Sequence, residues 1–156
     1  MEIERKFLPR FFPADWELCP HSELEQAYLC VGPVVRIRKE DDTYYLTYKG
    51  GGAMIREEYN LPLNRKAYEH LKAKADGNIL NKTRYRIPLS DSLTAELDCF
   101  HGPFEGMYLV EVEFPDEESA RAFIPPSWFG EEVTFDRRYH NSYLSQLEIP
   151  GRFPET

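Results

Sequence analysis

The feature that most constrains this chain is a strict alternation of side-chain type with a period of two residues. Seven segments show it: residues 2–7, 34–39, 44–49, 55–59, 82–87, 94–99 and 109–114. This period is typical of a β-strand, whose successive side chains point to opposite faces. Asp41-Asp42 and Gly50-Gly51-Gly52 lie between neighbouring segments and supply turn residues, which predicts consecutive hairpins. We therefore expect a largely antiparallel sheet or barrel.

Helices are expected at only three places. Asn64 can cap a helix over residues 65–75, and Asp116 can cap a short helix over residues 117–123, which Pro125 ends. A third helix is predicted over residues 139–147. The 156 residues of the chain correspond to one domain. The sequence therefore predicts a single, mainly β domain over residues 1–156, with a few peripheral helices.

The composition argues against several classes of binding partner and indicates the cellular compartment. The 19 basic and 27 acidic residues give a net charge of −8, which argues against a nucleic-acid partner because nucleic-acid-binding domains usually carry a basic surplus. The sequence contains no run of 18 apolar residues, the length that a membrane-spanning helix needs, and its charged first residues do not resemble a signal peptide. Cys19, Cys30 and Cys99 form an odd, scattered set that disfavours a disulfide framework. We expect a cytoplasmic protein with no membrane partner.

One face of the predicted strands concentrates charge of both signs. It holds eight basic and seven acidic residues: Glu2, Glu4, Lys6, Arg36, Arg38, Lys49, Arg56, Glu58, Lys82, Arg84, Arg86, Glu96, Asp98, Glu111 and Glu113. Charge counts alone favour a solvated sheet face with cross-strand ion pairs. The alternative is a closed barrel whose interior, the lumen, is the charged face. Such a lumen would need water, ions and a highly charged ligand, because unpaired buried charges cost several kcal/mol each.

The two signs cluster along the sequence. Glu2 with Glu4, and Glu111 with Glu113, form carboxylate pairs of the kind that bind Mg²⁺ or Mn²⁺ through oxygen. The basic strips, which could bind phosphate oxygens, comprise Arg36/Arg38, Lys82/Arg84/Arg86, Lys49 and Arg56. Together they predict a site for a polyphosphate bound as its metal complex.

Eight motifs resemble a known family. Glu2-Ile3-Glu4-Arg5-Lys6 is similar to the ExExK signature of the CYTH domain, that is, of the triphosphate tunnel metalloenzymes. The resemblance continues in the family's order through residues 34–38, 46–50, 56–59, 82–86, 96–98, 110–114 and 136–141, and so covers about residues 2–144. It implies an eight-stranded antiparallel β-barrel closed into a tunnel, and so outweighs the solvated-sheet interpretation.

The resemblance also implies a role for most of the charged positions. It makes Glu2, Glu4 and Glu113 ligands of a first metal. It makes Glu58, Asp98 and Glu111 carboxylates that hold a second metal or orient the attacking water. The implied phosphate clamp comprises Arg36, Arg38, Lys49, Arg56, Lys82 and Arg84. Lys6 would contact the scissile end of the substrate or help product release, whereas Arg86, Glu96 and Arg138 fit the lumen without an assigned step.

The function implied is hydrolysis of a linear triphosphate that depends on Mg²⁺ or Mn²⁺. Inorganic tripolyphosphate, cleaved to pyrophosphate and phosphate, is the favoured small-molecule substrate. Thiamine triphosphate, nucleoside triphosphates and an adenylate cyclase activity remain alternatives, as does a non-hydrolytic module that binds polyphosphate or nucleotide. The many lumen carboxylates argue against a simple polyanion binder, which would gain from them only if they held metal. A monomer and a homodimer are both open.

Overall fold

The computed structural model describes residues 1–90 and 92–148, which contain ten β-strands and three α-helices. The strands are β1 (Glu2–Pro9), β2 (His21–Val31), β3 (Val34–Glu40), β4 (Thr43–Lys49), β5 (Ile55–Arg56), β6 (Glu58–Leu63), β7 (Asp76–Pro88), β8 (Thr94–Phe100), β9 (Tyr108–Glu113) and β10 (Phe129–Glu132). The helices are α1 (Arg65–Lys72), α2 (Glu117–Ala122) and α3 (Asn141–Ser145). Short 3₁₀ turns are η1 (Trp16–Leu18), η2 (Gly102–Phe104) and η3 (Arg137–Tyr139).

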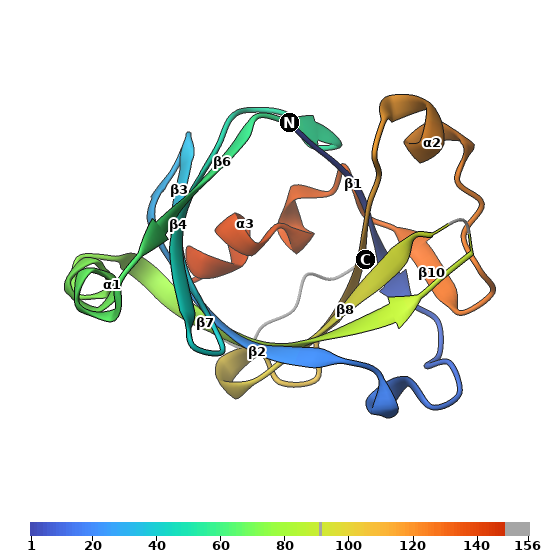
Figure 1. The fold of residues 1–156 in the computed structure, drawn as a ribbon, viewed down its shortest axis with the longest axis horizontal. Helices are drawn as coiled ribbons and strands as arrows, with labels where there is room; N and C mark the ends of the chain where they lie inside the picture. Colours follow the sequence, from blue (N-terminus) through green and yellow to red (C-terminus); the bar gives the residue numbers. More distant parts are fainter. Residues whose placement is uncertain (91, 149–156) are drawn as a thin grey trace.

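The strands form one antiparallel sheet that curls into a barrel (Figure 1). Their order is β10-β1-β9-β8-β7-β2-β3-β4-β6. The short strand β5 pairs back to β1, with Glu2 opposite Arg56 and Ile3 opposite Ile55. This pairing links the β4–β6 end of the sheet to β1 and nearly closes the barrel. The predicted antiparallel barrel is confirmed.

The predicted count of eight strands differs from the ten observed in the described residues. Eight strands of six or more residues form the wall, and the two-residue β5 and four-residue β10 are additions. The predicted strand over 55–59 is split into β5 and β6. The sequence did not reveal β2, because both of its faces mix polar and apolar residues. Ser22, Leu24 and Gln26 alternate on one side with Glu23 and Glu25 on the other.

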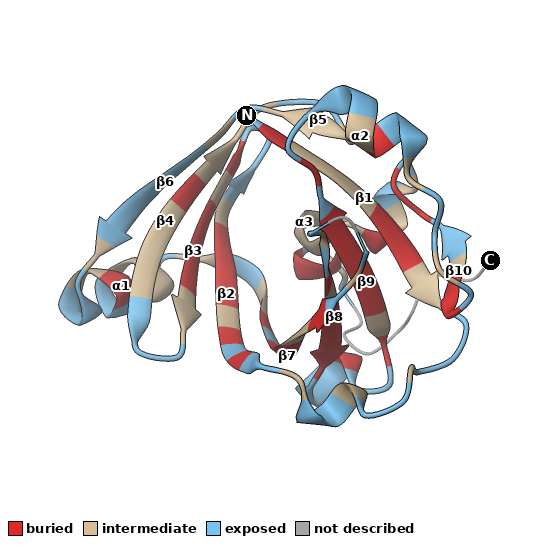
Figure 2. Cartoon of the chain, turned by 45° about the vertical axis from the view of Figure 1, so that its right-hand side comes forward, coloured by how far each residue is buried: buried red, intermediate tan, exposed pale blue. Residues whose placement is uncertain are grey.

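The apolar face of the wall points outward and is covered by other elements. One core lies on the outer side of β1, β8 and β9, beneath α2 and β10, and includes Phe7, Leu97, Val110, Val112 and Phe129. A second core packs Ala27 and Ile37 against Tyr68 of α1. Figure 2 shows the buried residues concentrated along β8 and β9. This arrangement leaves the charged face of the strands pointing inward.

One end of the barrel interior is filled by a third apolar core. Leu80, Phe100 and Leu109 share the inward face of their strands with charged residues, and they pack with Tyr139 of η3 and Leu144 of α3. Figure 1 shows α3 lying across the interior of the barrel. The charged part of the lumen is therefore confined to the rest of the interior.

The predicted helix starts are confirmed more closely than the ends. The Asn64 side chain accepts a hydrogen bond from the Ala67 amide at 2.7 Å, and α1 ends at Lys72 instead of residue 75. Asp116 caps α2 by accepting from the Ser119 amide at 2.7 Å. The region 139–147 forms η3 and the five-residue α3 instead of one helix. Among the described residues, no helix has the length and apolar character required to cross a membrane.

Candidate active site

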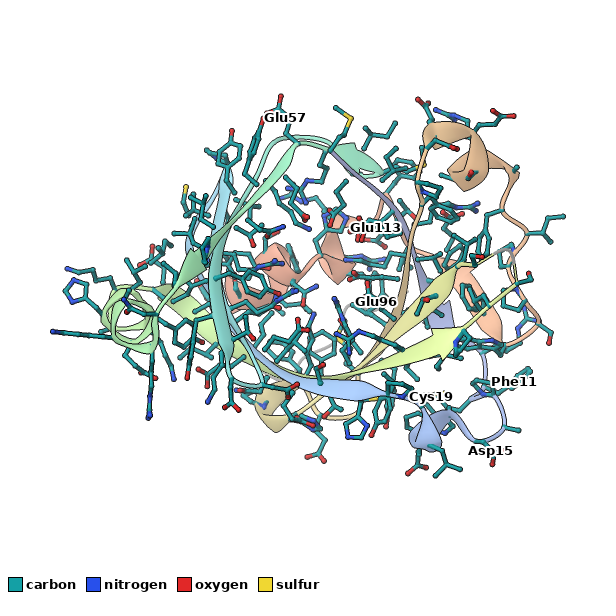
Figure 3. The ribbon with its side chains drawn as sticks, viewed as in Figure 1. Phe11, Asp15, Cys19, Glu57, Glu96 and Glu113 are labelled. Carbon is teal, nitrogen blue, oxygen red and sulfur yellow. The ribbon has the colours of Figure 1, made fainter. Side chains whose placement is uncertain are left out.

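The barrel encloses a cavity of about 460 Å³ lined mainly by charged side chains. Thirteen of the fifteen charged positions predicted for one strand face line it, and Lys82 and Asp98 do not. Figure 3 shows Glu96 and Glu113 in the interior and Glu57 on the outside. With Glu40, the lining carries seven carboxylates and seven basic groups. The solvated-sheet interpretation is therefore wrong, and the charged face is the lumen.

One wall of the cavity, formed by β1 and β9, places carboxylates side by side. Glu4 on β1 lies directly opposite Glu113 on β9, an arrangement that is destabilising for like charges. Within the described residues, neither of these carboxylates has an ion-pair partner. Burial and the charge of Glu111 raise the pKa of Glu4 to about 7, and burial also raises the pKa of Glu113. The charge of Lys49 offsets these rises only in part, because it acts on both carboxylates from beyond ion-pair distance.

Glu2 and Glu58 share one lysine beside this wall. Lys49 Nζ lies 2.8 Å from Glu2 Oε1 and 3.5 Å from Glu58 Oε2. Burial and the neighbouring Glu4 raise the pKa of Glu2 to about 8 despite this contact. Burial would also raise the pKa of Glu58, but a hydrogen bond from Glu2 and the charge of Lys49 lower it to about 2. One lysine therefore does not neutralise the whole group.

A second set of carboxylates is neutralised by the protein itself. Arg84 Nε donates to Asp98 Oδ1 at 2.8 Å, and Arg84 also pairs with Glu96 at 3.1 Å and Glu111 at 3.6 Å. Lys6 Nζ lies 3.5 Å from Glu111. Burial opposes ionisation of Glu111, but Lys6 and Arg84 hold its pKa well below the usual range.

Lys82 and Asp98 lie on the inward face of β7 and β8 but are covered by neighbouring side chains. Lys82 Nζ is 2.7 Å from Asp98 Oδ2, and both side chains have 0% solvent exposure. Lys82 also donates to Asn141 Oδ1 at 3.0 Å. Burial works against the charged form of Asp98, but Arg84 and Lys82 lower its pKa. The structure thus places these two predicted site residues in contact with Arg84 and Asn141, and not at the cavity surface.

The basic wall on β3 keeps donors available. Arg36 Nη2 donates to Thr47 Oγ1 at 3.2 Å, and Arg36 Nε is buried with no partner in the described structure. Arg38 donates to Gln26 Oε1 at 2.7 Å, a neutral acceptor. Arg86 pairs with Glu40 at 2.9 Å. Arg36 and Arg38 are therefore not neutralised by carboxylates as Arg84 is.

The remaining predicted residues are divided between the cavity and the exterior. Arg56 lines the cavity and donates from Nε to Gly50 O at 3.0 Å. Arg138 pairs with Asp136 at 2.6 Å and does not line the cavity.

Several neutral side chains of the cavity were not predicted. They are Tyr28, Tyr45, Asn60, Thr134, His140, Asn141 and Ser142. Three of them belong to the segment that enters the barrel with α3, and no strand alternation marks that segment. Residues 136–141 matched a family motif, and this was the only signal that could have drawn attention to it.

The donor set fits a hard divalent cation. Carboxylate oxygens are the ligands that Mg²⁺ and Mn²⁺ prefer, and Glu4 faces Glu113 across the β1–β9 pair, with neither in an ion pair among the described residues. The described residues contain no ready-made cluster of three or more close metal-ligating side chains. A cation at this wall would therefore be held by a few carboxylates together with substrate or water, the usual arrangement for Mg²⁺.

The antiparallel barrel covers its apolar face with other elements and encloses equal numbers of carboxylates and basic groups. This is the architecture of the triphosphate tunnel metalloenzymes, the CYTH class. No family model matches the sequence. An inorganic triphosphatase from Nitrosomonas europaea is 44% identical over 153 residues, which cover 96% of this chain and 99% of that protein. An inorganic triphosphatase from Acetivibrio thermocellus is 39% identical over 113 residues, 70% of each chain. The chain belongs to the inorganic triphosphatase family.

Solved structures agree with this assignment. The crystal structure of an inorganic triphosphatase superposes with a TM-score of 0.70 at 41% identity, covering 97% of both chains. A putative adenylyl cyclase from Hippeastrum with a dominant triphosphatase activity superposes with a TM-score of 0.58 over 78% of this chain and 83% of its own. At 16% identity, the second comparison shows a shared fold only.

Proposed function

We propose that this protein hydrolyses inorganic tripolyphosphate to pyrophosphate and phosphate with the help of Mg²⁺ or Mn²⁺. The observation that carries the proposal is the wall on which Glu4 faces Glu113, with neither in an ion pair among the described residues, together with Arg36 of β3, whose buried Nε has no partner there. The names of the two relatives, both inorganic triphosphatases at 39–44% identity, support the substrate class.

The charge of the cavity supports the need for metal. The cavity has as many carboxylates as basic groups, seven of each, so their charges cancel once a bound cation keeps Glu2 and Glu4 ionised, whereas tripolyphosphate carries roughly four to five negative charges near neutral pH. The protein alone therefore leaves the substrate charge uncompensated. One or two divalent cations would supply most of the missing positive charge.

The residues proposed to hold the cation are Glu2, Glu4 and Glu113. When bound there, a divalent cation neutralises phosphate oxygens and lowers the pKa of a coordinated water. Arg36, Arg38 and Lys49 would bind the remaining phosphate oxygens, because phosphoryl transfer depends chiefly on positioning and charge neutralisation.

The proposed step is attack of water on a terminal phosphorus. The water oxygen forms a bond to that phosphorus, and the bond from phosphorus to the bridging oxygen breaks, so that its electron pair leaves with pyrophosphate. Glu58 or Glu111 would orient the water and accept its proton. Lys6, paired with Glu111 at 3.5 Å, would contact the scissile end of the substrate.

We propose supporting roles for Asp98, Lys82 and Arg84. Asp98 and Lys82 are fully buried, and Asp98 holds the Arg84 guanidinium through two hydrogen bonds of 2.8 and 2.9 Å. These contacts fix Arg84 between Glu96 and Glu111, so that it can still present a guanidinium edge to phosphate. Asp98 and Lys82 then act on substrate only through Arg84 and Asn141.

A substrate panel tests the proposal. Purified protein with Mg²⁺ or Mn²⁺ is given tripolyphosphate, thiamine triphosphate, ATP or pyrophosphate, and phosphate and pyrophosphate are both quantified. We expect tripolyphosphate to be cleaved fastest, yielding equal amounts of the two products. Faster cleavage of an organic triphosphate would contradict the choice of substrate. Tight binding of tripolyphosphate without any cleavage would favour the binding-module alternative.

A further inference from the structure

A second cavity of about 400 Å³, called here the side pocket, opens beside α3. Its polar lining consists of Arg56, Arg137, His140, Ser142, Tyr143 and Gln146. Three of these residues, Arg56, His140 and Ser142, also line the main cavity. The two cavities are therefore neighbours that share a wall.

The side pocket differs from the main cavity in its charge. Its lining contains two arginines and no carboxylate, whereas seven carboxylates line the main cavity. Burial and the charge of Lys6 lower the pKa of His140, so the positive charge of the pocket comes from Arg56 and Arg137. Hydroxyl groups of Ser142 and Tyr143 add uncharged donors. This lining suits an oxyanion that carries no metal ion.

The position of the side pocket suggests which anion reaches it. The apolar core of Leu80, Phe100, Leu109 and Leu144 fills the barrel at the α3 end, so a linear ligand cannot continue along the barrel axis there. The shared residues Arg56 and His140 instead place the side pocket next to the main cavity, beside α3. An anionic chain too long for the main cavity would be directed to this opening.

We propose that the side pocket binds a phosphoryl group of a linear polyphosphate longer than three phosphates. The inference rests on the proposed function, because it requires that the main cavity hold the three phosphates at the cleaved end. Arg137 is then a specificity residue for chain length. It is exposed, and within the described residues its guanidinium has no carboxylate partner.

The test compares tripolyphosphate and tetrapolyphosphate as substrates of the wild type and of Arg137→Ala. We expect the variant to raise KM for tetrapolyphosphate about three- to tenfold, the effect of losing one partly solvated charged contact. KM for tripolyphosphate should stay within about twofold. Arg137→Lys should recover part of the loss. Arg65→Ala, which removes the same charge from α1 on the outside of the barrel (Figure 1), should change neither value.

The results that would contradict the inference differ from those that would contradict the proposed function. An unchanged ratio of the two KM values in Arg137→Ala would overturn the inference while leaving the proposed function intact. Failure of the wild type to cleave tripolyphosphate would instead refute the proposed function. The phosphate that binds in the side pocket could instead be the orthophosphate product, and inhibition of the wild type and Arg137→Ala by added orthophosphate tests this alternative. If Arg137→Ala weakened only that inhibition, the pocket would hold departing product, and the assignment to longer substrates would be wrong.

Discussion

At the scale of single residues, the pairing of Glu4 with Glu113 is costly for folding. Like charges directly opposite each other on neighbouring strands are destabilising, and this pair is in register on β1 and β9. Burial and Glu111 already raise the pKa of Glu4 to about 7. A bound cation would reverse the cost, because it gives both carboxylates a shared partner.

Glu4→Gln tests this role. Removing an anionic metal ligand without changing side-chain size should lower turnover of tripolyphosphate by roughly 10²-fold or more. The free energy of unfolding in the absence of metal should stay equal or increase, since the like-charge contact is gone. Steady-state kinetics and urea unfolding measure the two effects. The matched control is Glu57→Gln on the outside of the barrel (Figure 3), which should keep wild-type turnover. Near-normal turnover of Glu4→Gln at saturating metal would exclude Glu4 as a ligand.

Two arginines of the lumen should respond differently to truncation. Arg84 holds three carboxylates, among them the fully buried Asp98, and breaking a buried ion pair costs about 3 kcal/mol. Arg38 contacts the neutral Gln26 and Tyr45, so its loss should cost about 1 kcal/mol. Arg38→Ala should therefore raise KM strongly with little loss of stability, whereas Arg84→Ala should lower the free energy of unfolding much more. Equal stability losses, measured by urea unfolding, would show that the buried network does not depend on Arg84.

At the scale of elements, α1 stabilises the barrel by packing on its outer side. Tyr68 of α1 is fully buried against Ala27 and Ile37, on the outer side of β2 and β3. Asn64 caps the helix through the Ala67 amide. Losing such a cap typically costs about 1 kcal/mol.

Asn64→Ala should therefore lower the free energy of unfolding by about 1 kcal/mol and leave KM and turnover for tripolyphosphate unchanged. Asn64→Asp, which keeps a side-chain acceptor at the cap, is the control and should retain most of the stability. Thermal or urea unfolding combined with kinetics checks both. A marked loss of turnover in a folded Asn64→Ala protein would mean that α1 influences the lumen.

The elements also show what the sequence can and cannot predict. Segments such as 34–39 and 109–114 were predicted because charge and apolar residues alternate on fixed faces. Most of the charged positions predicted for one strand face therefore line the lumen, as expected. The strand β2 was missed because Leu24 and Gln26 share one face. The neutral residues that α3 brings to the cavity, such as Asn141 and Ser142, depend on tertiary packing that has no local periodicity. The family motif signalled the charged residues but not that Asp98 and Lys82 would be buried together.

At the scale of the whole molecule, the barrel reverses the usual arrangement of a small β-barrel. Most of its apolar residues face outward under α1, α2 and β10, while the interior beyond the apolar core at α3 holds equal numbers of carboxylates and basic groups. The proposed function requires that a highly charged substrate bind in this lumen together with cations. The central claim is therefore that catalysis requires a divalent cation at the carboxylate wall.

The most direct test is the rate of phosphate release from tripolyphosphate before and after the metal is removed. Protein stripped with chelator and assayed in excess chelator should show no turnover above background. Adding Mg²⁺ or Mn²⁺ beyond the chelator should restore it, while a monovalent salt of equal ionic strength should not. Undiminished turnover by the metal-stripped protein in excess chelator would contradict the account.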